Sequence, residues 1–397
     1  MVTEFQDRNV RSVRTQVFLP LFSVAEWLAQ NWWFLQAEAE RPGNGINTSF
    51  DRRHNLRWAR EGFALPSLRL VTLGQLTELR WEPLEIPKAG ISFLARGRAV
   101  LSSADVSAAI HEFVTAVVAR LDDSDVLRTS LHDEWTAVQN ADEHEREFCL
   151  AAARLGEDPY SLKTPLETKI LEVAKDIRPE LLNDFLSVAQ INELTEQGAA
   201  LARASESIAS DSEAVDALRG IRAYVPAIEN SKNAWENGYR FAQVLRAKLN
   251  GGRWKSRSLD DLAGYLRIDQ IDHCLLKSDN DCRFLDALTG VNQRNNPKFL
   301  IEKERPDARQ FAFCRALFAS LTSCPQFAAV SKVQTVQQQM NRAFAAELLA
   351  PHDLIKRDLS SSEIGEDEVD DLAADYGVSS FVIRHQIENH RIARVCS

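Results

Sequence analysis

The chain has 397 residues, more than a single hydrophobic core usually needs, so its length predicts two or three domains. Its hydrophobic content of 45%, charged content of 26% and formal net charge of −10 are typical of a globular protein. They argue against nucleic-acid binding by the whole surface but leave room for a local basic patch. The sequence contains no run of about 18 apolar residues, so we expect no membrane span. The first residues lack the apolar core of a secretion signal, so we expect a cytoplasmic location.

The first 122 residues mix predicted strands and helices. Short runs of branched and aromatic residues predict strands, and apolar residues spaced by three and four predict helices. The predicted elements are a strand over 15–21, an apolar helix over 24–41, a hairpin of 68–73 and 76–84, a strand pair over 91–101 with a turn at Gly97, and a serine-capped helix from Ser102. Trp27, Trp32, Trp33 and Phe34 surround much of the helix over 24–41, which predicts that it is buried.

Residues 123–250 have a helical pattern throughout. One predicted helix has acidic residues near its start, Gly156 at its end and Pro159 beyond, which are the usual signals of helix ends. Further helices are predicted over 179–205 and 231–252. The acidic and polar stretch over 204–216 is the best candidate for a linker, and the alternative is a loop between two helices.

After Gly251 and Gly252 the pattern changes to short strands followed by helices. The predicted elements are strands over 268–276, 284–290 and 297–303, helices over 309–323 and 326–349, an acidic connector over 360–371, and two helices over 369–393 joined by a turn at Gly377. We therefore predict an α+β fold that is predominantly helical. It comprises an N-terminal α/β domain (1–122), a helical region (123–250) and a C-terminal domain (251–397).

The six cysteines are scattered along the chain and none forms a C-x-x-C pair, which predicts buried free thiols. They are Cys149, Cys274, Cys282, Cys314, Cys324 and Cys396. His273 and Cys274, with Cys282 nearby, match no standard zinc-ligand spacing, so we expect no metal there. The sequence also has no glycine-rich phosphate loop and no local signature of a Ser-His-Asp or Cys-His nucleophile, and we expect no cofactor.

Three motifs in the C-terminal 150 residues follow one another in an order that can be compared with known families. They are "RQFAFCRALFASLTS" from Arg309, "NRAFAAELLAP" from Asn341 and "LAADYGVSS" from Leu372. In this order and spacing they resemble the ImmA/IrrE family of zinc metallopeptidases, and "FAAELLAP" is the most specific match. The resemblance implies a zincin-like C-terminal domain. In that family one helix carries a His-Glu-x-x-His motif and the next helix carries a glutamate as third ligand.

The functional residues of that family are replaced in this chain. When Phe311 is matched to the family's phenylalanine, Arg315 stands at the first zinc histidine, Ala316 at the catalytic glutamate and Ala319 at the second histidine. Counting back from Phe344 places Gln338 at the third ligand. Arginine is permanently cationic and has no lone pair to donate, and alanine offers no donor at all. The resemblance therefore implies a peptidase scaffold without metal ligands or general base.

No other histidine nearby restores the motif. None lies between His273 and His352, and the His-Glu pairs at His111 and His144 lack a second histidine four residues later. Two interpretations of Arg315 remain open. Its guanidinium either contacts an acidic or carbonyl group inside the former cleft or extends to solvent from the edge of a helix.

Two basic segments are candidates for nucleic-acid binding. The two C-terminal helices have the order of a helix-turn-helix, and the second carries residues that can contact phosphates and base edges, namely Arg384, His385, Asn389, His390 and Arg391. Against DNA binding, the first of these helices is acidic. The second segment surrounds Trp58 with Arg52, Arg53, His54, Arg57 and Arg60. It is either a phosphate-binding cluster or, as we favour, a connector that forms ion pairs with the acidic middle region.

The resemblance favours a catalytically inactive ImmA/IrrE-like protein that regulates or scaffolds. Its protein partner would be a repressor, a toxin or a defence component, held through the former cleft. Stress response, control of mobile elements and phage defence are the processes that the family implies. The alternatives are a DNA-binding regulator that uses the C-terminal helices and a zinc metallopeptidase whose ligands are not recognisable in the sequence.

Overall fold

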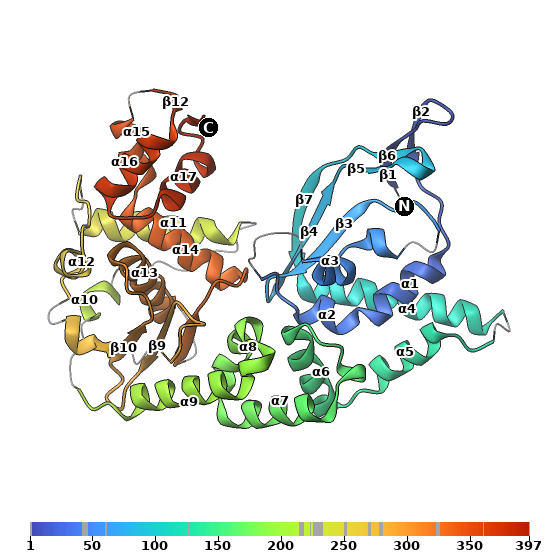
Figure 1. Ribbon diagram of the computed structural model, residues 1–397, viewed down its shortest axis with the longest axis horizontal. Helices are drawn as coiled ribbons and strands as arrows, with labels where there is room; N and C mark the ends of the chain where they lie inside the picture. Colours follow the sequence, from blue (N-terminus) through green and yellow to red (C-terminus); the bar gives the residue numbers. More distant parts are fainter. Residues whose placement is uncertain are drawn as a thin grey trace. The chain divides into compact units, whose positions relative to one another are not determined.

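The structure is a computed structural model, and it describes residues 2–41, 47–59, 62–124, 127–213, 218–222, 224, 233–249, 252–268, 271–277, 281–322, 326–359 and 361–396. It is an α+β fold in which helices dominate, as predicted (Figure 1). The chain forms two compact units, Met1–Leu171 and Glu172–Ser397, whose boundary falls within helix α7 (Thr164–Asp176). The finer division at residues 122 and 250 stays a prediction. Among the described residues, no helix is long and apolar enough to cross a membrane.

The N-terminal unit combines two antiparallel sheets with a layer of helices. Its strands are β1 (Val2–Asp7), β2 (Ser12–Gln16), β3 (Ser67–Thr72), β4 (Leu76–Glu82), β5 (Leu84–Ile86), β6 (Ile91–Phe93) and β7 (Gly97–Ser102). One sheet has the order β2-β1-β6-β5 and the other β3-β4-β7. Its helices are α1 (Leu21–Gln30), α2 (Trp32–Ala37), α3 (Thr48–His54), η1 (Leu56–Trp58), η2 (Pro87–Ala89), α4 (Ser103–Asp122), α5 (Ser130–Asn140), α6 (Glu143–Leu155) and η3 (Pro159–Ser161).

The core of this unit lies between the helices and the sheet of β3, β4 and β7 (Figure 1). Trp27, Trp33 and Trp135 are buried in it, so the prediction that the tryptophan-rich helical segment is buried is confirmed. Local signals set the helix ends. Ser102 caps α4 through Asp105 N, and Gly156 ends α6 in the left-handed conformation with φ 82°.

Three predictions for the N-terminal unit need correction. The strand over 15–21 is wrong beyond Gln16, because Pro20 is the N-cap of helix α1. The single helix over 24–41 is two helices that meet at Asn31, whose side-chain amide donates to Trp27 O and so competes with the helical pattern. The strands β6 and β7 exist, but they belong to different sheets and do not pair with each other. The hairpin of β3 and β4 is confirmed.

The C-terminal unit is built on the sheet β11-β9-β10-β8. Its strands are β8 (Leu275–Leu276), β9 (Ala287–Val291), β10 (Pro297–Ile301), β11 (Phe327–Val330), β12 (Glu363–Ile364) and β13 (Arg394–Val395). Its helices are α8 (Pro179–Val188), η4 (Ile191–Glu193), α9 (Leu194–Ser210), α10 (Arg219–Arg222), α11 (Ala234–Lys248), α12 (Leu259–Leu266), η5 (Ile271–Cys274), α13 (Pro306–Thr322), α14 (Val336–Leu349), α15 (His352–Asp358), α16 (Glu366–Tyr376) and α17 (Ser380–Asn389).

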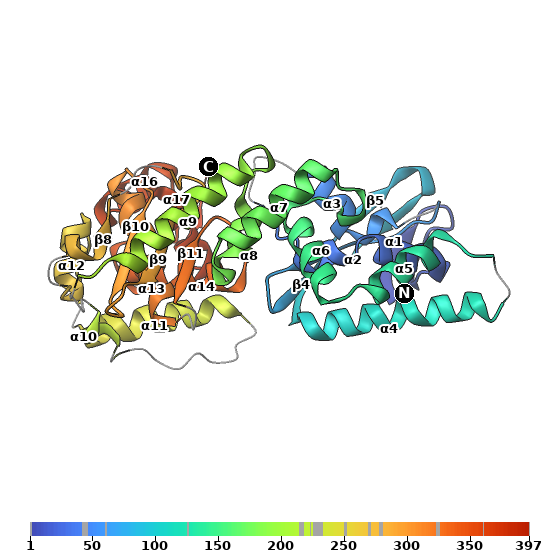
Figure 2. The same cartoon turned by 90° about the horizontal axis from the view of Figure 1, so that it is seen from below.

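Helices cover both faces of this sheet. Phe299 of β10 packs against Phe313 of α13, with ring centroids 5.2 Å apart, on one face. On the other face Gly290 of β9 leaves room for the ring of Phe327 and, beyond it, for Ile208 of α9, and α9 contacts β9 and β10 (Figure 2). Alternation of side chains along a strand explains how one sheet serves two helical layers. Helix α13 therefore lies in the centre of the unit, and nearly all of its residues from Gln310 to Ala319 are buried.

Helix α14 connects this centre to the C-terminal helices. It packs against α13 and closely against α11, where a Cβ at Gly238 would lie only 2.4 Å from Met340 O, so only glycine allows the approach. The C-terminal helices α16 and α17 are confirmed as a packed pair, joined at Gly377 with φ 63°.

Four predictions for the C-terminal unit need correction. The single helix over 179–205 is two helices, α8 and α9, with the short helix η4 between them. The candidate linker over 204–216 begins inside α9, which continues to Ser210. The helix over 326–349 is wrong in its first part, because Phe327–Val330 pairs with β9 as strand β11 before α14 begins at Val336. The strand over 268–276 is mostly the short helix η5, and only Leu275 and Leu276 pair with β10. The cysteines at 149, 274, 282 and 314 are buried and free as predicted, whereas Cys396 is exposed. Arg60 and Cys324 lie outside the described residues.

Candidate functional site

Arg315 and Gln338, which the sequence comparison placed at the first and third ligand positions, lie in contact inside the C-terminal unit. Arg315 comes from α13 and Gln338 from the first turn of α14, and the Arg315 Nη2 atom donates to Gln338 Oε1 at 2.9 Å. The Arg315 side chain is only 5% exposed. Ala316 and Ala319 are fully buried on the same helix.

The other partners of Arg315 complete what we call the Arg315 cluster, which comprises Arg315, Gln338, Asp286 and Ser331. Arg315 Nη1 donates to Asp286 Oδ2 at 2.5 Å, and Nη2 also donates to Ser331 O. Gln338 accepts from Ser331 N at 3.2 Å and donates to Ala329 O at 2.7 Å. The expected contact with an acidic or carbonyl group is therefore confirmed, and the interpretation that Arg315 extends to solvent is wrong.

One carboxylate, that of Asp286, faces the cations in and around the Arg315 cluster, and carbonyl groups accept their remaining hydrogen bonds. Burial would raise the pKa of Asp286, but Arg315 and Lys303 outweigh burial and hold this pKa below its usual value. Lys303 Nζ lies 2.6 Å from Asp286 Oδ1. Burial together with the charge of Arg315 lowers the pKa of Arg342 to about 10, and Arg342 donates to Val333 O at 2.6 Å.

These residues do not fit the zinc ion that the resemblance implies. A guanidinium nitrogen carries its protons outward and repels a cation, and the two alanines have no donor atom. The side-chain oxygen of Gln338 already accepts from Arg315 and Ser331 N, and its amide nitrogen donates to Ala329 O. A side-chain cation thus occupies the position at which the resemblance would place the metal.

The same contacts close the free edge of the sheet. Strand β11 is the edge strand, and its outward carbonyl at Ala329 accepts from Gln338. The carbonyl of Ser331, one residue beyond the strand, accepts from Arg315. These two acceptors are occupied, which leaves fewer free groups on β11 for an added strand. The Arg315 cluster itself is buried, and the expectation that a partner binds through the former cleft stays a prediction.

The C-terminal basic residues are mostly engaged within the protein. Arg384 forms an ion pair with Glu366, Asn389 donates to Tyr239 Oη at 3.2 Å, and His390 stacks on His352. His385 and Arg391 are exposed. Exposed acidic residues line the neighbouring helix α16, at Glu366, Asp367, Asp370, Asp371 and Asp375. This surface repels phosphates, which argues against DNA binding by α17.

The arginines at the end of α3 serve the N-terminal unit. Arg53 pairs with Glu38, and Arg57 with the buried Asp51. Arg52 is exposed and its guanidinium lies 5.4 Å from the Trp58 ring centroid. These arginines form ion pairs, but not those that the connector interpretation expects. The partners of Arg53 and Arg57 are acids near α2 and within α3, and not the acidic middle region.

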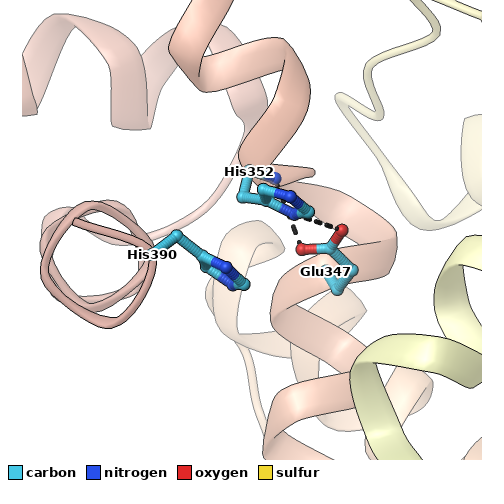
Figure 3. A group of neighbouring side chains, drawn as sticks. All are labelled: Glu347, His352 and His390. Carbon is cyan, nitrogen blue, oxygen red and sulfur yellow. Dashed lines mark hydrogen bonds and ion pairs between the residues drawn. The ribbon is translucent and has the colours of Figure 1, made fainter. Parts of the chain in front are cut away.

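A cluster that the sequence analysis missed lies at the other end of α14 (Figure 3). Glu347, His352 and His390 place ligand atoms within 4.8 Å of one another, and they are the one group among the described residues with such a set of possible metal donors. Burial and the nearby His352 lower the pKa of His390, whereas the hydrogen bond to Glu347 raises that of His352. The signal in the sequence was a glutamate and a histidine on either side of Pro351.

The comparisons with known proteins add no relative. No family model, no curated protein and no solved structure matches this chain. The functional argument therefore depends on the residues and geometry of the chain itself.

Proposed function

We propose that the C-terminal unit is a zincin-like, ImmA/IrrE-like domain without peptidase activity, and that the protein acts as a regulatory or scaffolding protein that binds a protein partner. Stress response, control of mobile elements and phage defence are the settings that the resemblance suggests. The observation that carries the proposal is the contact between Arg315 and Gln338. Arg315 and Gln338, 23 positions apart, meet in one buried cluster, as the resemblance implies for the first and third ligands of such a site.

The chemistry of the Arg315 cluster supports a non-catalytic role. Hydrolysis by this class of enzyme needs a metal-bound water and a general base. Arg315 supplies neither, and Ala316, at the position of the base, is a buried methyl group in the core. The cluster instead ties α13, α14 and β11 together through charge-assisted hydrogen bonds.

A partner must then bind an exposed surface. The described residues include several large apolar side chains that solvent reaches, among them Phe18 at 87% exposure in the N-terminal unit and Phe381 at 69% on α17. Exposed aromatic residues are common anchors of protein interfaces. Phe381 also packs edge-on against His385, with centroids 4.2 Å apart, which preorganises both rings.

The absence of peptidase activity is tested with the purified full chain, zinc and an unfolded casein substrate. We expect no cleavage above a buffer control, and chelator-sensitive cleavage would contradict the proposal. The partner is sought by capture on the tagged chain in its native host, comparing wild type with Phe18→Ser and Phe381→Ser. Arg305→Ser, an exposed arginine, is the matched control. A defined partner that one phenylalanine variant loses and the control retains supports the proposal, whereas equal recovery by all variants argues against these anchors.

A further inference from the structure

Glu347, His352 and His390 come from three helical elements that meet at one point. Glu347 lies in the last turn of α14, His352 is the first residue of α15, and His390 is the C-cap of α17. Figure 3 shows the two imidazole rings beside the carboxylate. His352 Nδ1 lies 2.8 Å from Glu347 Oε1, and the two histidine rings are stacked with centroids 4.1 Å apart.

The carboxylate of Glu347 is fixed in place before any ligand arrives. Its side chain is 2% exposed, and it accepts hydrogen bonds from Gln386 Nε2 at 2.9 Å and Gln243 Nε2 at 3.2 Å. Gln386 also donates to Ala350 O, which fixes the amide itself. Such support of a ligand by surrounding hydrogen bonds is typical of metal centres. Within the described ranges, Glu347 has no lysine or arginine partner, and His352 is its one ion-pair partner.

His390 adds an independent observation. Its Nε2 atom is buried and has no hydrogen-bond partner among the described residues. A buried polar atom without a partner costs free energy, so it calls for an explanation. Its neighbours His352 and Glu347 are themselves donor residues, and a bound cation would satisfy all three side chains at once.

We propose that Glu347, His352 and His390 bind one divalent transition-metal ion, with zinc the best match to the donor set. Two imidazoles and one carboxylate are the protein ligands of several zinc sites that keep a fourth position for water. Bonds of about 2.0–2.2 Å require ligand atoms roughly 3.3 Å apart, so the group contracts modestly on binding. One of the stacked rings must turn so that the lone pairs converge, and rotation about the terminal torsion of histidine is inexpensive.

The location of the proposed site gives the ion a structural role. The ion would join the end of α14 to α15 and α17, and so hold the C-terminal helices against the central helix. Glu347 and His390 lie at the carboxyl ends of their helices, where the helix dipole favours a cation. His352 is 22% exposed, which gives an ion a path from solvent. This inference does not depend on the proposed function, because it involves none of the residues of the Arg315 cluster.

The test is a titration of the metal-stripped full chain with zinc chloride alone, followed by calorimetry, with cobalt absorption as a report on coordination. All proteins carry Cys396→Ser, because that exposed thiol is a competing ligand. We expect one zinc per chain, and at least a tenfold loss of affinity in His390→Ala and in His352→Ala. His385→Ala, an exposed histidine on the same helix α17, is the matched control and should bind as wild type does.

The outcomes separate the two proposals. No stoichiometric zinc on the wild type, or less than a tenfold loss in either variant, overturns the metal site. Circular dichroism of the metal-free variants checks that they fold. We expect them to fold, because both histidines are partly exposed. Casein cleavage by the full chain bears on the proposed function alone. It is measured in a separate assay, on the full chain and on the Arg315→Met variant.

Discussion

Helix α14 contributes one residue to each of two polar clusters, and the two clusters differ in where their cation comes from. Near its start, Gln338 belongs to a cluster whose cation is a side chain, the guanidinium of Arg315. Near its end, Glu347 belongs to a cluster that offers a carboxylate and two imidazoles, with one ring nitrogen unpartnered. A cation that is part of the chain cannot leave, so the first cluster has a structural role. The second leaves its cation to be supplied from solution.

The energetic difference follows from burial. Arg315 and Asp286 are both almost inaccessible, so removing Asp286 leaves the buried guanidinium without its carboxylate. Removing Arg315 leaves the buried carboxylate with Lys303 as its one remaining cation among the described residues. His352 and His390 are partly exposed, and removing His390 strands no charge. Removing His352 takes away the ion-pair partner of the buried Glu347, but that carboxylate keeps its hydrogen bonds from Gln386 and Gln243. The two clusters should therefore respond differently to mutation, to metal and to pH.

The largest effect is expected for Arg315→Met. The substitution leaves Asp286 buried with Lys303 as its remaining cation and frees the carbonyl of Ser331, so unfolding should become easier by about 3–5 kcal/mol. Urea denaturation followed by tryptophan fluorescence measures this loss. Arg305→Met, an exposed arginine at the start of the same helix, should show no measurable loss. A decrease in the free energy of unfolding of less than about 1 kcal/mol in Arg315→Met would show that the cluster contributes little to stability.

Zinc should produce the next largest effect, through the second cluster alone. At a free zinc concentration 100 times the dissociation constant, the stabilisation is about 2.7 kcal/mol for an ion that binds only the folded chain. The thermal midpoint of the wild type should rise accordingly, and that of His390→Ala should not. A zinc-dependent rise that Arg315→Met loses and His390→Ala keeps would reverse the assignment of the two clusters.

A pH dependence should distinguish Asp286. Because Arg315 and Lys303 hold its folded pKa below the unfolded value, its contribution is fully present above the unfolded pKa and is lost as the pH falls through the folded pKa. Each unit of lowering contributes about 1.4 kcal/mol. The unfolding free energy between pH 6 and acid should fall less steeply in Asp286→Asn than in wild type. Asp281→Asn, an exposed control, should retain the wild-type slope, and an equal slope in all three would sink the assignment.

The smallest effect is expected for DNA. Arg384 is paired with Glu366, and exposed acidic side chains line the neighbouring helix α16. Neither Arg384→Ala nor Arg391→Ala should therefore change the affinity of the protein for mixed DNA at low salt. Fluorescence anisotropy with a labelled duplex measures this. A salt-dependent affinity that both variants reduce would favour the DNA-binding alternative instead.

Elements with local signals could be predicted from the sequence. The serine cap of α4, the left-handed Gly156 after α6 and the Gly377 turn between α16 and α17 are where the pattern placed them. Strand β11 could not be predicted in this way. Its residues include Ala328 and Ala329, which favour helices, and it is a strand because it pairs with β9. Tertiary pairing outweighed local preference at that position.

The sequence by itself determined that Arg315, Ala316 and Ala319 bind no metal, because an arginine and two alanines offer no ligand atom whatever their surroundings. Only the tertiary structure decided what Arg315 contacts, since its partners come from a strand start, a loop and another helix. The same holds for His352 and His390, which lie on different helices and meet only because α15 and α17 fold back onto the end of α14. Donor chemistry is a property of single residues, whereas a site is a property of distances between them.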